Sequence, residues 1–278
     1  MVLPRPNGPA LMLHRQQKER LVDVVVDPVL SRALRPHQVE GVKFLYEAVM
    51  GMRLEAQGCI LADEMGLGKT VQAITLIYTL LKQSPFPAPR QAIQRAVIVC
   101  PVTLCQNWKN EITKWLGRDR IQVVIGTNEP VVSQWRMSRS SQVLIIGYER
   151  LSSMAEMLQS KASNAPVGLI ICDEGHRLKG KQSQINKTLN AFTECKMRVI
   201  LSGTPVQNNL TEFHTMVGKS NQGGLWDRAR LRGVDRLSRL ADWICPGILG
   251  DYKSFKSGRS DMSSIMCSLE QGADPLIA

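Results

Sequence analysis

The sequence predicts an α/β fold in which a parallel β-sheet is covered by helices on both faces. The first observation is a series of six short, continuously apolar runs, rich in β-branched residues, between residues 58 and 202. The second is that segments with helical spacing of apolar residues separate these runs. Buried runs that alternate with helices are typical of parallel sheets with both faces covered. One α/β domain is therefore expected over this range, and not two.

The chain begins with a flanking segment, residues 1–30, whose first part is rich in proline and glycine. It ends in VDVVVDPVL, which is predicted to form a short strand closed by Pro28. A helix is predicted to begin close to Pro36, because proline suits the first helical turn. Apolar residues at helical spacing carry this helix to about Met50.

The expected elements then alternate along the chain. The six strands are expected in the runs at 58–61, 96–101, 121–126, 142–148, 168–176 and 198–205. The helices between them are expected at 69–82, 104–116, around Met154 and at 182–192, with a polar segment reaching Ser141. In such folds ligands bind at the carboxyl ends of the strands, so the polar residues that follow each run are the candidate functional groups.

The segment CILADEMGLGKTVQ (residues 59–72) joins the first run to a helix through a glycine-rich loop. The backbone N–H groups of such a loop and of the helix N-terminus form a concavity that suits phosphate. Lys69 would reach the outer phosphates, and the Thr70 hydroxyl can hold Mg²⁺. The usual pattern, G-x-x-x-x-G-K-[ST], is not fully met, because Asp63 stands at its first glycine. Taken alone, the segment fits a phosphate loop or a plain turn that caps a helix.

Two further polar groups follow predicted strands: Asp173-Glu174, and Ser202-Gly203-Thr204. One acid at a strand end is more often a solvated cap, but a pair beside a phosphate loop suggests chemistry. Asp173 can hold Mg²⁺ through water, and Glu174 can orient and deprotonate the water that attacks a γ-phosphate. The glycine-rich loop, the acid pair and Ser202-Gly203-Thr204 thus all follow predicted strands, and this shared position favours a nucleotide site.

Composition limits the possible classes of protein. The net charge of +11 permits a polyanionic partner, but a solvated basic surface explains it equally well. The seven cysteines form no C-x-x-C motif, so core thiols in a reducing compartment are favoured over metal ligands. No run approaches the roughly 18 apolar residues of a membrane helix, so no membrane association is expected. The N-terminus lacks the apolar run of a signal peptide.

Five segments in order resemble the first motor lobe of the SWI/SNF-type double-stranded-DNA translocases. They are LRPHQVEGVKFLYE, ILADEMGLGKTVQ, VIVCPVTLCQNWKNE, LIICDEGHRLK and LSGTPVQNNLTEF. Their sequences are most similar to those of the recombination-repair branch, the Rad-fifty-four type and especially its B paralogue. The resemblance covers residues 34–217 and implies a RecA-like sheet. In that family Asp63 belongs to the usual form of the loop, DEMGLGKT.

The resemblance implies ATP and Mg²⁺ as cofactors and assigns roles to individual residues. Gln38 matches a glutamine that reads the adenine edge; a surface glutamine is the alternative. The phosphate cradle corresponds to Asp63, Glu64, Met65, Gly66, Leu67, Gly68, Lys69 and Thr70. Thr70 and Asp173 would hold Mg²⁺, with Glu174 as the hydrolytic base and Lys69 as a third catalytic group.

The resemblance also implies contacts with DNA. Thr103 and Asn107 fall in a segment that runs along the DNA backbone, where they would bond phosphates without reading bases. Trp108 is interpreted as a core anchor instead. The positions that couple the nucleotide to DNA are His176, Ser202, Gly203 and Thr204, although SGTP is also a good helix-start sequence.

The chain departs from the family after residue 217. Residues 218–241, with six basic and two acidic side chains, separate the lobe from a family-like remnant at 242–257. This insertion is interpreted as a basic DNA-contacting arm or, preferentially, as an intron read in frame, since Gly-Lys-Ser can be encoded by a nucleotide sequence that contains a splice donor. Residues 258–278 form a divergent tail that is expected to be irregular.

The resemblance implies an ATP-dependent double-stranded-DNA translocase of homologous-recombination repair, located in the nucleus. Its expected partners are duplex DNA, bound without sequence preference, and a strand-exchange recombinase filament. The arginine-bearing motifs of a second lobe are not found after residue 257, so slow ATP hydrolysis is expected of this chain alone. A non-catalytic nucleotide- or DNA-binding fragment and a chromatin-remodelling ATPase remain the alternatives.

Overall fold

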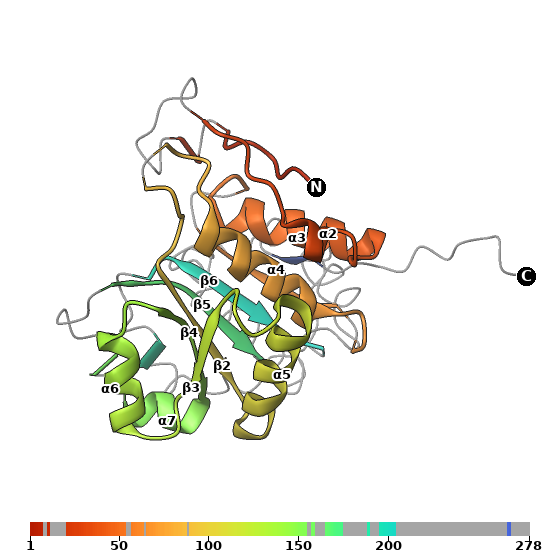
Figure 1. Cartoon of the computed structure of the whole chain (residues 1–278). Coiled ribbons are helices and arrows are strands. Elements are labelled where there is room, and N and C mark those ends of the chain that lie inside the picture. Colours follow the sequence, from red (N-terminus) through yellow and green to blue (C-terminus); the bar gives the residue numbers. More distant parts are fainter. Residues whose placement is uncertain are drawn as a thin grey trace, which may run out of the picture.

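The protein was analysed as a computed structural model, and part of the chain is described. The described residues are 1–7, 10–11, 21–53, 57–63, 65–87, 89–154, 157–158, 165–174, 188–189, 195–203 and 266–267. They contain one β-sheet with helices on both of its faces (Figure 1). The α/β fold expected from the sequence is therefore confirmed.

All six expected strands are present. The strands are β1 (Gly58–Leu61), β2 (Arg95–Cys100), β3 (Gln122–Ile125), β4 (Ser141–Gly147), β5 (Val167–Asp173), β6 (Met197–Leu201) and the short β7 (Met266–Cys267). They lie in the order β3-β4-β2-β5-β6-β1-β7, and every pairing between neighbours is parallel. Because all strands run in one direction, their carboxyl ends share one edge of the sheet.

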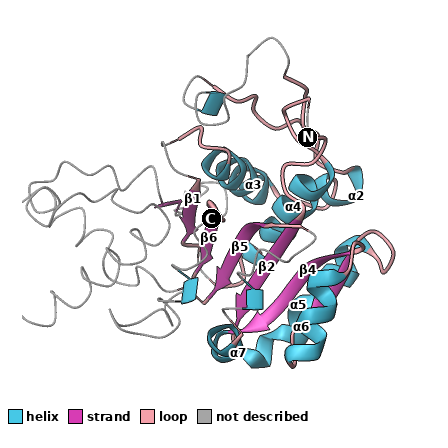
Figure 2. Cartoon of the chain, turned by 90° about the vertical axis from the view of Figure 1, so that its left-hand side faces the viewer, coloured by secondary structure: helices cyan, strands magenta, loops and turns pink. Residues whose placement is uncertain are grey.

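The helices, cyan in Figure 2, flank the magenta strands, and they divide into two groups by the apolar clusters to which they belong. Those in the described residues are α2 (Pro28–Ser31), α3 (Pro36–Val49), α4 (Lys69–Lys82), α5 (Cys105–Leu116), α6 (Glu129–Met137) and α7 (Tyr148–Ser153), together with the 3-10 turn η2 (Val102–Leu104). Helices α3, α4 and α5 share one buried apolar cluster with the sheet, whereas α6 and α7 share the other. Among the described residues no helix has both the length and the apolar character needed to cross a membrane.

The strands join these two clusters because their side chains alternate between the faces. Ile98 and Cys100 of β2 belong to the cluster of α3, α4 and α5, while Val97 and Val99 belong to that of α6 and α7. All residues of β2 are buried. This burial on both faces explains why the strands read as continuous apolar runs.

Two expectations about local structure were wrong. The segment VDVVVDPVL makes only one isolated antiparallel bridge, between Val2 and Val25, and is no regular strand. Its end starts a helix, because the Asp27 carboxylate accepts a hydrogen bond from the backbone N–H of Val29 at 2.9 Å. The polar segment before Ser141 contains helix α6, capped by Asn128. Of the helix expected at 182–192, only residues 188–189 are described.

Candidate functional site

Three polar loops meet at the carboxyl ends of three neighbouring strands, β5, β6 and β1. The loop after β6 contacts the loop after β1, since the backbone N–H of Ser202 donates to the carbonyl of Leu61 at 3.1 Å. Gly203 lies so close that a Cβ atom there would be 2.8 Å from Cγ of Met65 and 3.9 Å from Nζ of Lys69. The tertiary structure therefore brings together groups that are about 140 residues apart in the chain.

The glycine-rich loop adopts a conformation that its glycines permit. Gly66 has φ 91° and Gly68 has φ 81°, both in the left-handed region that side chains disfavour. Gly68 is the N-cap of α4, so Lys69 and Thr70 form the first turn of that helix. Met65 stands at the rim of the loop with 75% of its surface exposed. The loop thus turns into the free N–H groups of a helix N-terminus, the arrangement that binds phosphate.

The side chain of Lys69 folds back and contacts the glycine-rich loop that precedes it. Its Nζ donates a hydrogen bond to the backbone carbonyl of Asp63 at 2.7 Å. Partial burial lowers the pKa of the Lys69 ammonium, and the carboxylates of Asp63, Glu174 and Asp173 oppose that change. The ammonium group therefore lies among three acids and within reach of the concavity.

The carboxylate of Asp173 is held by two donors. The indole Nε1 of Trp108 donates to Oδ2 at 2.8 Å, and the backbone N–H of Glu174 donates to Oδ1 at 2.9 Å. The hydroxyl of Tyr148 donates to the backbone carbonyl of Asp173 at 2.6 Å. Burial raises the pKa of Asp173, an effect that the Trp108 hydrogen bond opposes and the Glu174 charge supports.

Glu174 itself has a backbone φ of 54° and is the non-glycine residue with positive φ among the described residues. A left-handed backbone costs an ordinary side chain about 1–2 kcal/mol. Such strain often accompanies functional positions, where the surroundings enforce it. The positive φ turns the chain at Glu174 away from the direction of β5, as suits a residue with a functional carboxylate at a strand end.

Gln38 lies behind the loop instead of on the surface. Its side chain is 9% exposed, and its Nε2 donates to the carbonyl of Leu67 at 3.2 Å. Its Oε1 accepts from the backbone N–H of Arg35 at 3.0 Å, which caps α3. A Cβ atom on Gly68 would lie 2.3 Å from Nε2 of Gln38. The surface-glutamine alternative is therefore wrong, and the Gln38 side chain lies directly beside the loop.

Gln72 is a site residue to which the sequence alone assigns no role. It is fully buried, and its Nε2 donates to Oδ2 of Asp63 at 3.5 Å, the long limit of a hydrogen bond. Its amide packs on the bare backbone of α3 at Gly41, where a Cβ atom would lie 1.8 Å from Oε1. A polar residue three positions after the loop lysine, in a helix whose other residues are mostly apolar, is the signal that the sequence offers.

The expected DNA-contacting residues occupy the neighbouring strand end. Thr103 lies in η2 and Asn107 in the first turn of α5, and both side chains are exposed. The next residue, Trp108, points the other way and is 1% exposed. Its interpretation as a core anchor is confirmed but incomplete, because its N–H also contacts Asp173.

Several expected positions lie outside the described residues. These are Glu64, His176, Thr204, the insertion at 218–241, the remnant at 242–257 and, apart from residues 266–267, the tail at 258–278.

The residues present fit a Mg²⁺-nucleotide. The loop offers a concavity with two glycines at positive φ, and the Thr70 hydroxyl stands at the start of the helix behind it. The adjacent carboxylates of Asp173 and Glu174 repel each other, and burial raises the pKa of Asp173, so a cation between Asp173 and a phosphate would relieve an unfavourable charge. Oxygen ligands of this kind are those that Mg²⁺ prefers.

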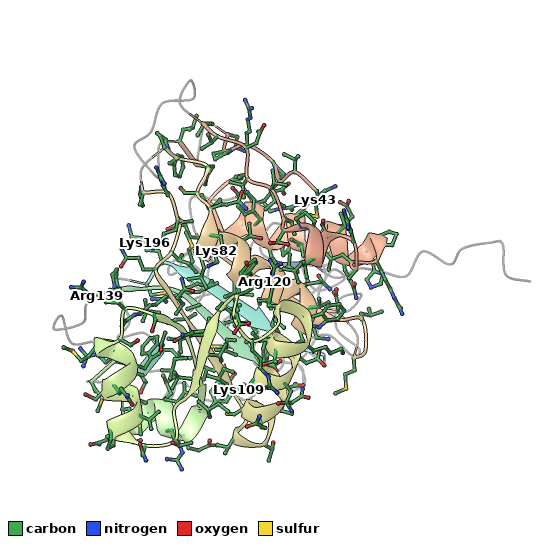
Figure 3. All side chains as sticks on the ribbon, viewed as in Figure 1. Lys43, Lys82, Lys109, Arg120, Arg139 and Lys196 are labelled. Carbon is green, nitrogen blue, oxygen red and sulfur yellow. The ribbon has the colours of Figure 1, made fainter. Side chains whose placement is uncertain are left out.

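The basic side chains do not by themselves mark a functional face. Six of them project from different elements (Figure 3), namely Lys43, Lys82, Lys109, Arg120, Arg139 and Lys196. Lys43 and Arg120 make ion pairs with Glu40 and Asp27. The positive charge is therefore spread over the described surface.

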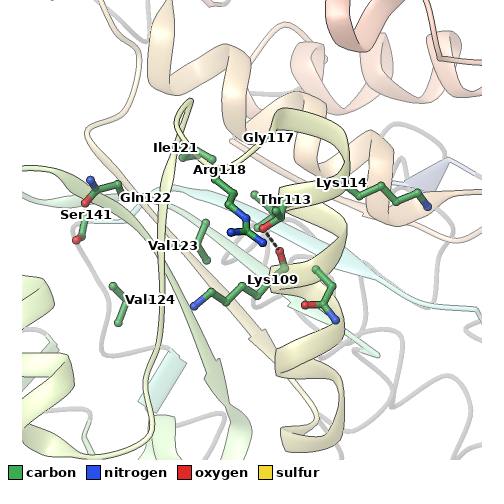
Figure 4. A pocket seen from close by; sticks show the side chains of 12 residues that line it. Lys109, Thr113, Lys114, Gly117, Arg118, Ile121, Gln122, Val123, Val124 and Ser141 are labelled. Atoms are coloured by element: carbon green, nitrogen blue, oxygen red, sulfur yellow. Dashed lines mark hydrogen bonds between the residues drawn. The ribbon is translucent and has the colours of Figure 1, made fainter.

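A separate cavity of about 710 Å³ lies between α5 and β3. The side chains of Lys109 and Arg118 point into it, whereas Lys114 points away (Figure 4). Its lining includes Gln122 and Ser141, the first residues of β3 and β4. It is thus found at the amino ends of the strands, opposite to the edge that carries the glycine-rich loop, and is no part of the candidate site.

The comparisons with known proteins agree with this geometry. The model of the SNF2-related domain matches residues 37–230. The chain is 46% identical over 245 residues to the "DNA repair protein rhp54" of Schizosaccharomyces pombe, covering 82% of this chain and 28% of that protein. It is 44% identical to the "DNA repair and recombination protein RAD54B" of Gallus gallus, covering 84% of this chain and 25% of that protein. It is 47% identical to the "DNA repair and recombination protein RAD54-like" of Danio rerio, covering 80% of this chain and 31% of that protein.

A solved structure shares the fold. The Sulfolobus solfataricus SWI2/SNF2 ATPase core in complex with dsDNA aligns with a TM-score of 0.58 at 21% sequence identity. The alignment covers 84% of this chain and 44% of that one. The chain thus spans between a quarter and a third of the curated relatives and less than half of the solved structure.

Proposed function

The chain belongs to the SNF2-related family, and on this basis we propose that it forms the first ATPase lobe of a double-stranded-DNA translocase that acts in recombination repair. The observation that carries the proposal is the convergence at one sheet edge of the glycine-rich loop, Lys69 and the Asp173-Glu174 pair. The names of the relatives, repair and recombination proteins, support the biological setting.

In the proposed mechanism the loop and the N-terminus of α4 bind the phosphates of ATP through backbone N–H groups. Lys69 leaves the carbonyl of Asp63 and donates to the outer phosphates instead, a short movement for a flexible side chain. Gln38, already placed against the loop, contacts the adenine edge.

Thr70 and Asp173 would hold Mg²⁺, which supplies neutralisation of the charge on the phosphates when it is bound. Glu174 orients the attacking water and accepts its proton. The strained backbone at Glu174 and the fixed carboxylate of Asp173 keep these two adjacent acids in separate roles.

We propose that duplex DNA lies across the exposed residues Thr103 and Asn107. Contacts to phosphates position a protein on DNA without reading its sequence. Binding should therefore be insensitive to sequence. Because the chain has a net charge of +11, its basic side chains should neutralise further phosphates, so binding should also weaken with salt, with a log–log slope of about 0.9 for each phosphate neutralised. Similar affinity at low and high salt would contradict this part of the proposal. A protein acting on duplex DNA in repair is further proposed to work in the nucleus, with a recombinase filament as partner.

The described residues provide one side of a site that, by the family resemblance, is completed by arginines from a second lobe. In GTPases an arginine finger contributes roughly 10³–10⁵ in rate. We therefore expect the 278-residue chain to bind Mg²⁺-ATP and to hydrolyse it slowly, with little stimulation by DNA. Turnover comparable to that of a two-lobed motor would contradict this expectation.

The test is a comparison of nucleotide binding by the chain and by two variants of helix α4. Lys69→Ala removes the loop ammonium, whereas Lys82→Ala removes an exposed lysine at the other end of the same helix. A charge-assisted hydrogen bond is worth about 1.5–3 kcal/mol, so Lys69→Ala should weaken binding of a fluorescent ATP analogue by roughly 10- to 100-fold. Lys82→Ala should bind like the unchanged chain. Equal affinity of all three proteins would overturn the nucleotide assignment.

A further inference from the structure

The acid that is proposed to hold Mg²⁺ is connected directly to the helix that is proposed to contact DNA. Trp108 of α5 donates its indole N–H to Oδ2 of Asp173 at 2.8 Å, across 65 residues of sequence. The second oxygen of the same carboxylate is held by its neighbour, the backbone N–H of Glu174. Among the described residues, Trp108 is therefore the side chain from outside β5 that orients this carboxylate by a hydrogen bond.

Trp108 cannot adjust independently of its helix. It is 1% exposed and belongs to the apolar cluster beneath α5, together with Ile112 and Leu116 of the same helix. Close packing of this kind fixes a side chain in one rotamer. A displacement of the start of α5 must therefore move the indole N–H relative to Asp173.

The opposite face of the same helical turn is exposed. Asn107 precedes Trp108 directly, and Thr103 lies one turn earlier in η2. A DNA phosphate bound by these residues would pull on the first turn of α5. The turn thus carries a candidate DNA contact on one side and a bond to the nucleotide site on the other.

A buried indole N–H usually finds some acceptor, so the contact could serve packing alone. The same helix offers a comparison, because Trp115 donates its Nε1 to Oε2 of Glu111 at 2.9 Å within α5 itself. That bond is local and partly exposed, and it touches neither the sheet edge nor the loop. The bond of Trp108 differs in reaching Asp173, one of the acids placed beside Lys69 and the glycine-rich loop.

We propose that Trp108 is a positioning residue that orients the carboxylate of Asp173 and transmits the position of α5, and with it the engagement of DNA, to the nucleotide site. The inference rests on the proposed function, in which Asp173 holds the Mg²⁺-nucleotide and α5 contacts DNA. Coupling between two binding sites is reciprocal, so DNA should change nucleotide affinity by the same factor as nucleotide changes DNA affinity.

The experiment compares the unchanged chain with Trp108→Phe and, as a matched control, Trp115→Phe. Both substitutions remove from helix α5 an indole N–H that donates to a carboxylate, of Asp173 in one case and of Glu111 in the other, and both keep an aromatic ring. The affinity of a fluorescent, non-hydrolysable ATP analogue is measured with and without a random-sequence duplex, and again as a function of free Mg²⁺. DNA affinity is measured with and without the analogue.

In the unchanged chain and in Trp115→Phe, DNA and nucleotide should change each other's affinity by the same factor, of order 5- to 150-fold if it is typical. In Trp108→Phe this factor should fall close to one in both directions. The Mg²⁺ concentration needed for nucleotide binding should rise by roughly 10- to 100-fold, as is usual when a residue that orients a metal ligand is lost. A residue that only packs would leave both quantities unchanged.

The outcomes separate the inference from the function on which it rests. If the unchanged chain binds neither nucleotide nor DNA, the proposed function fails. If it couples them and Trp108→Phe couples them equally, with the same Mg²⁺ dependence, the inference is overturned. Should Trp108→Phe fail to fold, a benzothiophene analogue of tryptophan at position 108 keeps the ring's shape and replaces only the N–H by sulfur. Retained coupling in that protein would overturn the inference as well.

Discussion

The contact between Gly41 of α3 and Gln72 of α4 allows a prediction whose sign depends on the tertiary structure. Replacing a glycine inside a helix by alanine normally stabilises it by about 1 kcal/mol. Here a Cβ atom on Gly41 would lie 1.8 Å from Oε1 and 2.9 Å from Cδ of Gln72. Because Gln72 is fully buried, its amide has no open space into which it can turn.

Overpacking of a buried position costs about 1–3 kcal/mol, and displacement of Gln72 would also break its bond to Asp63. Gly41→Ala should therefore lower the free energy of unfolding by about 1–2 kcal/mol, opposite to the helix-propensity effect. With Gln72→Ala already present, the methyl group occupies the vacated space. In that background Gly41→Ala should be neutral or stabilising, so the two substitutions should show a coupling energy of about 2 kcal/mol.

The assay is urea unfolding of the four proteins of this double-mutant cycle, followed by circular dichroism. Nucleotide affinity is measured in parallel, since Gln72 holds Asp63 and Asp63 holds Lys69. If Gly41→Ala destabilises the chain equally with and without the Gln72 side chain, the steric argument is refuted. Stabilisation by Gly41→Ala in the unchanged background would refute it as well.

Three shorter predictions follow from the loop and the core. Gly68→Ala should destabilise the chain more than Gly66→Ala in urea unfolding, because both residues have positive φ but only a Cβ at Gly68 meets another side chain, Gln38 at 2.3 Å; equal losses would contradict this. Burial raises the pKa of the Cys100 and Cys172 thiols. The folded state therefore keeps protons that the unfolded chain loses. The contribution of these thiols to the free energy of unfolding should be constant below about pH 8.5 and fall above it, so stability should decrease with pH in that range; a rise with pH there would exclude this cause. The same thiols should react with iodoacetamide only after urea unfolding, as mass spectrometry would show.

Much of the fold could be predicted because its signals are local. Each strand of the doubly covered sheet is a short β-branched run, and this pattern identified all six strands from β1 to β6. The helix after the glycine-rich loop was predicted with its observed bounds, Lys69 to Lys82. Where the prediction failed, a local signal was misread: the Asp27-Pro28 pair is a helix start, and Asn128 is the cap of α6.

The candidate site was predictable in its members and not in its contacts. The positions of the loop, of Asp173-Glu174 and of Ser202-Gly203 at strand ends follow from the sequence, because a strand end is visible where an apolar run stops. The sequence could not say that β6 lies between β5 and β1, which is what places Gly203 against Lys69.

The sequence by itself determined the types of the elements from β1 to β6 apart from α6, the shared edge at which the polar groups lie, and the family to which the chain belongs. Only the tertiary structure decided that Gln38 packs behind the loop, that Gln72 fills the space at Gly41, and that Trp108 reaches Asp173. The physical reason is that periodic burial and turn chemistry act over a few residues. Contacts between distant side chains depend instead on how the whole core packs, which no short segment encodes.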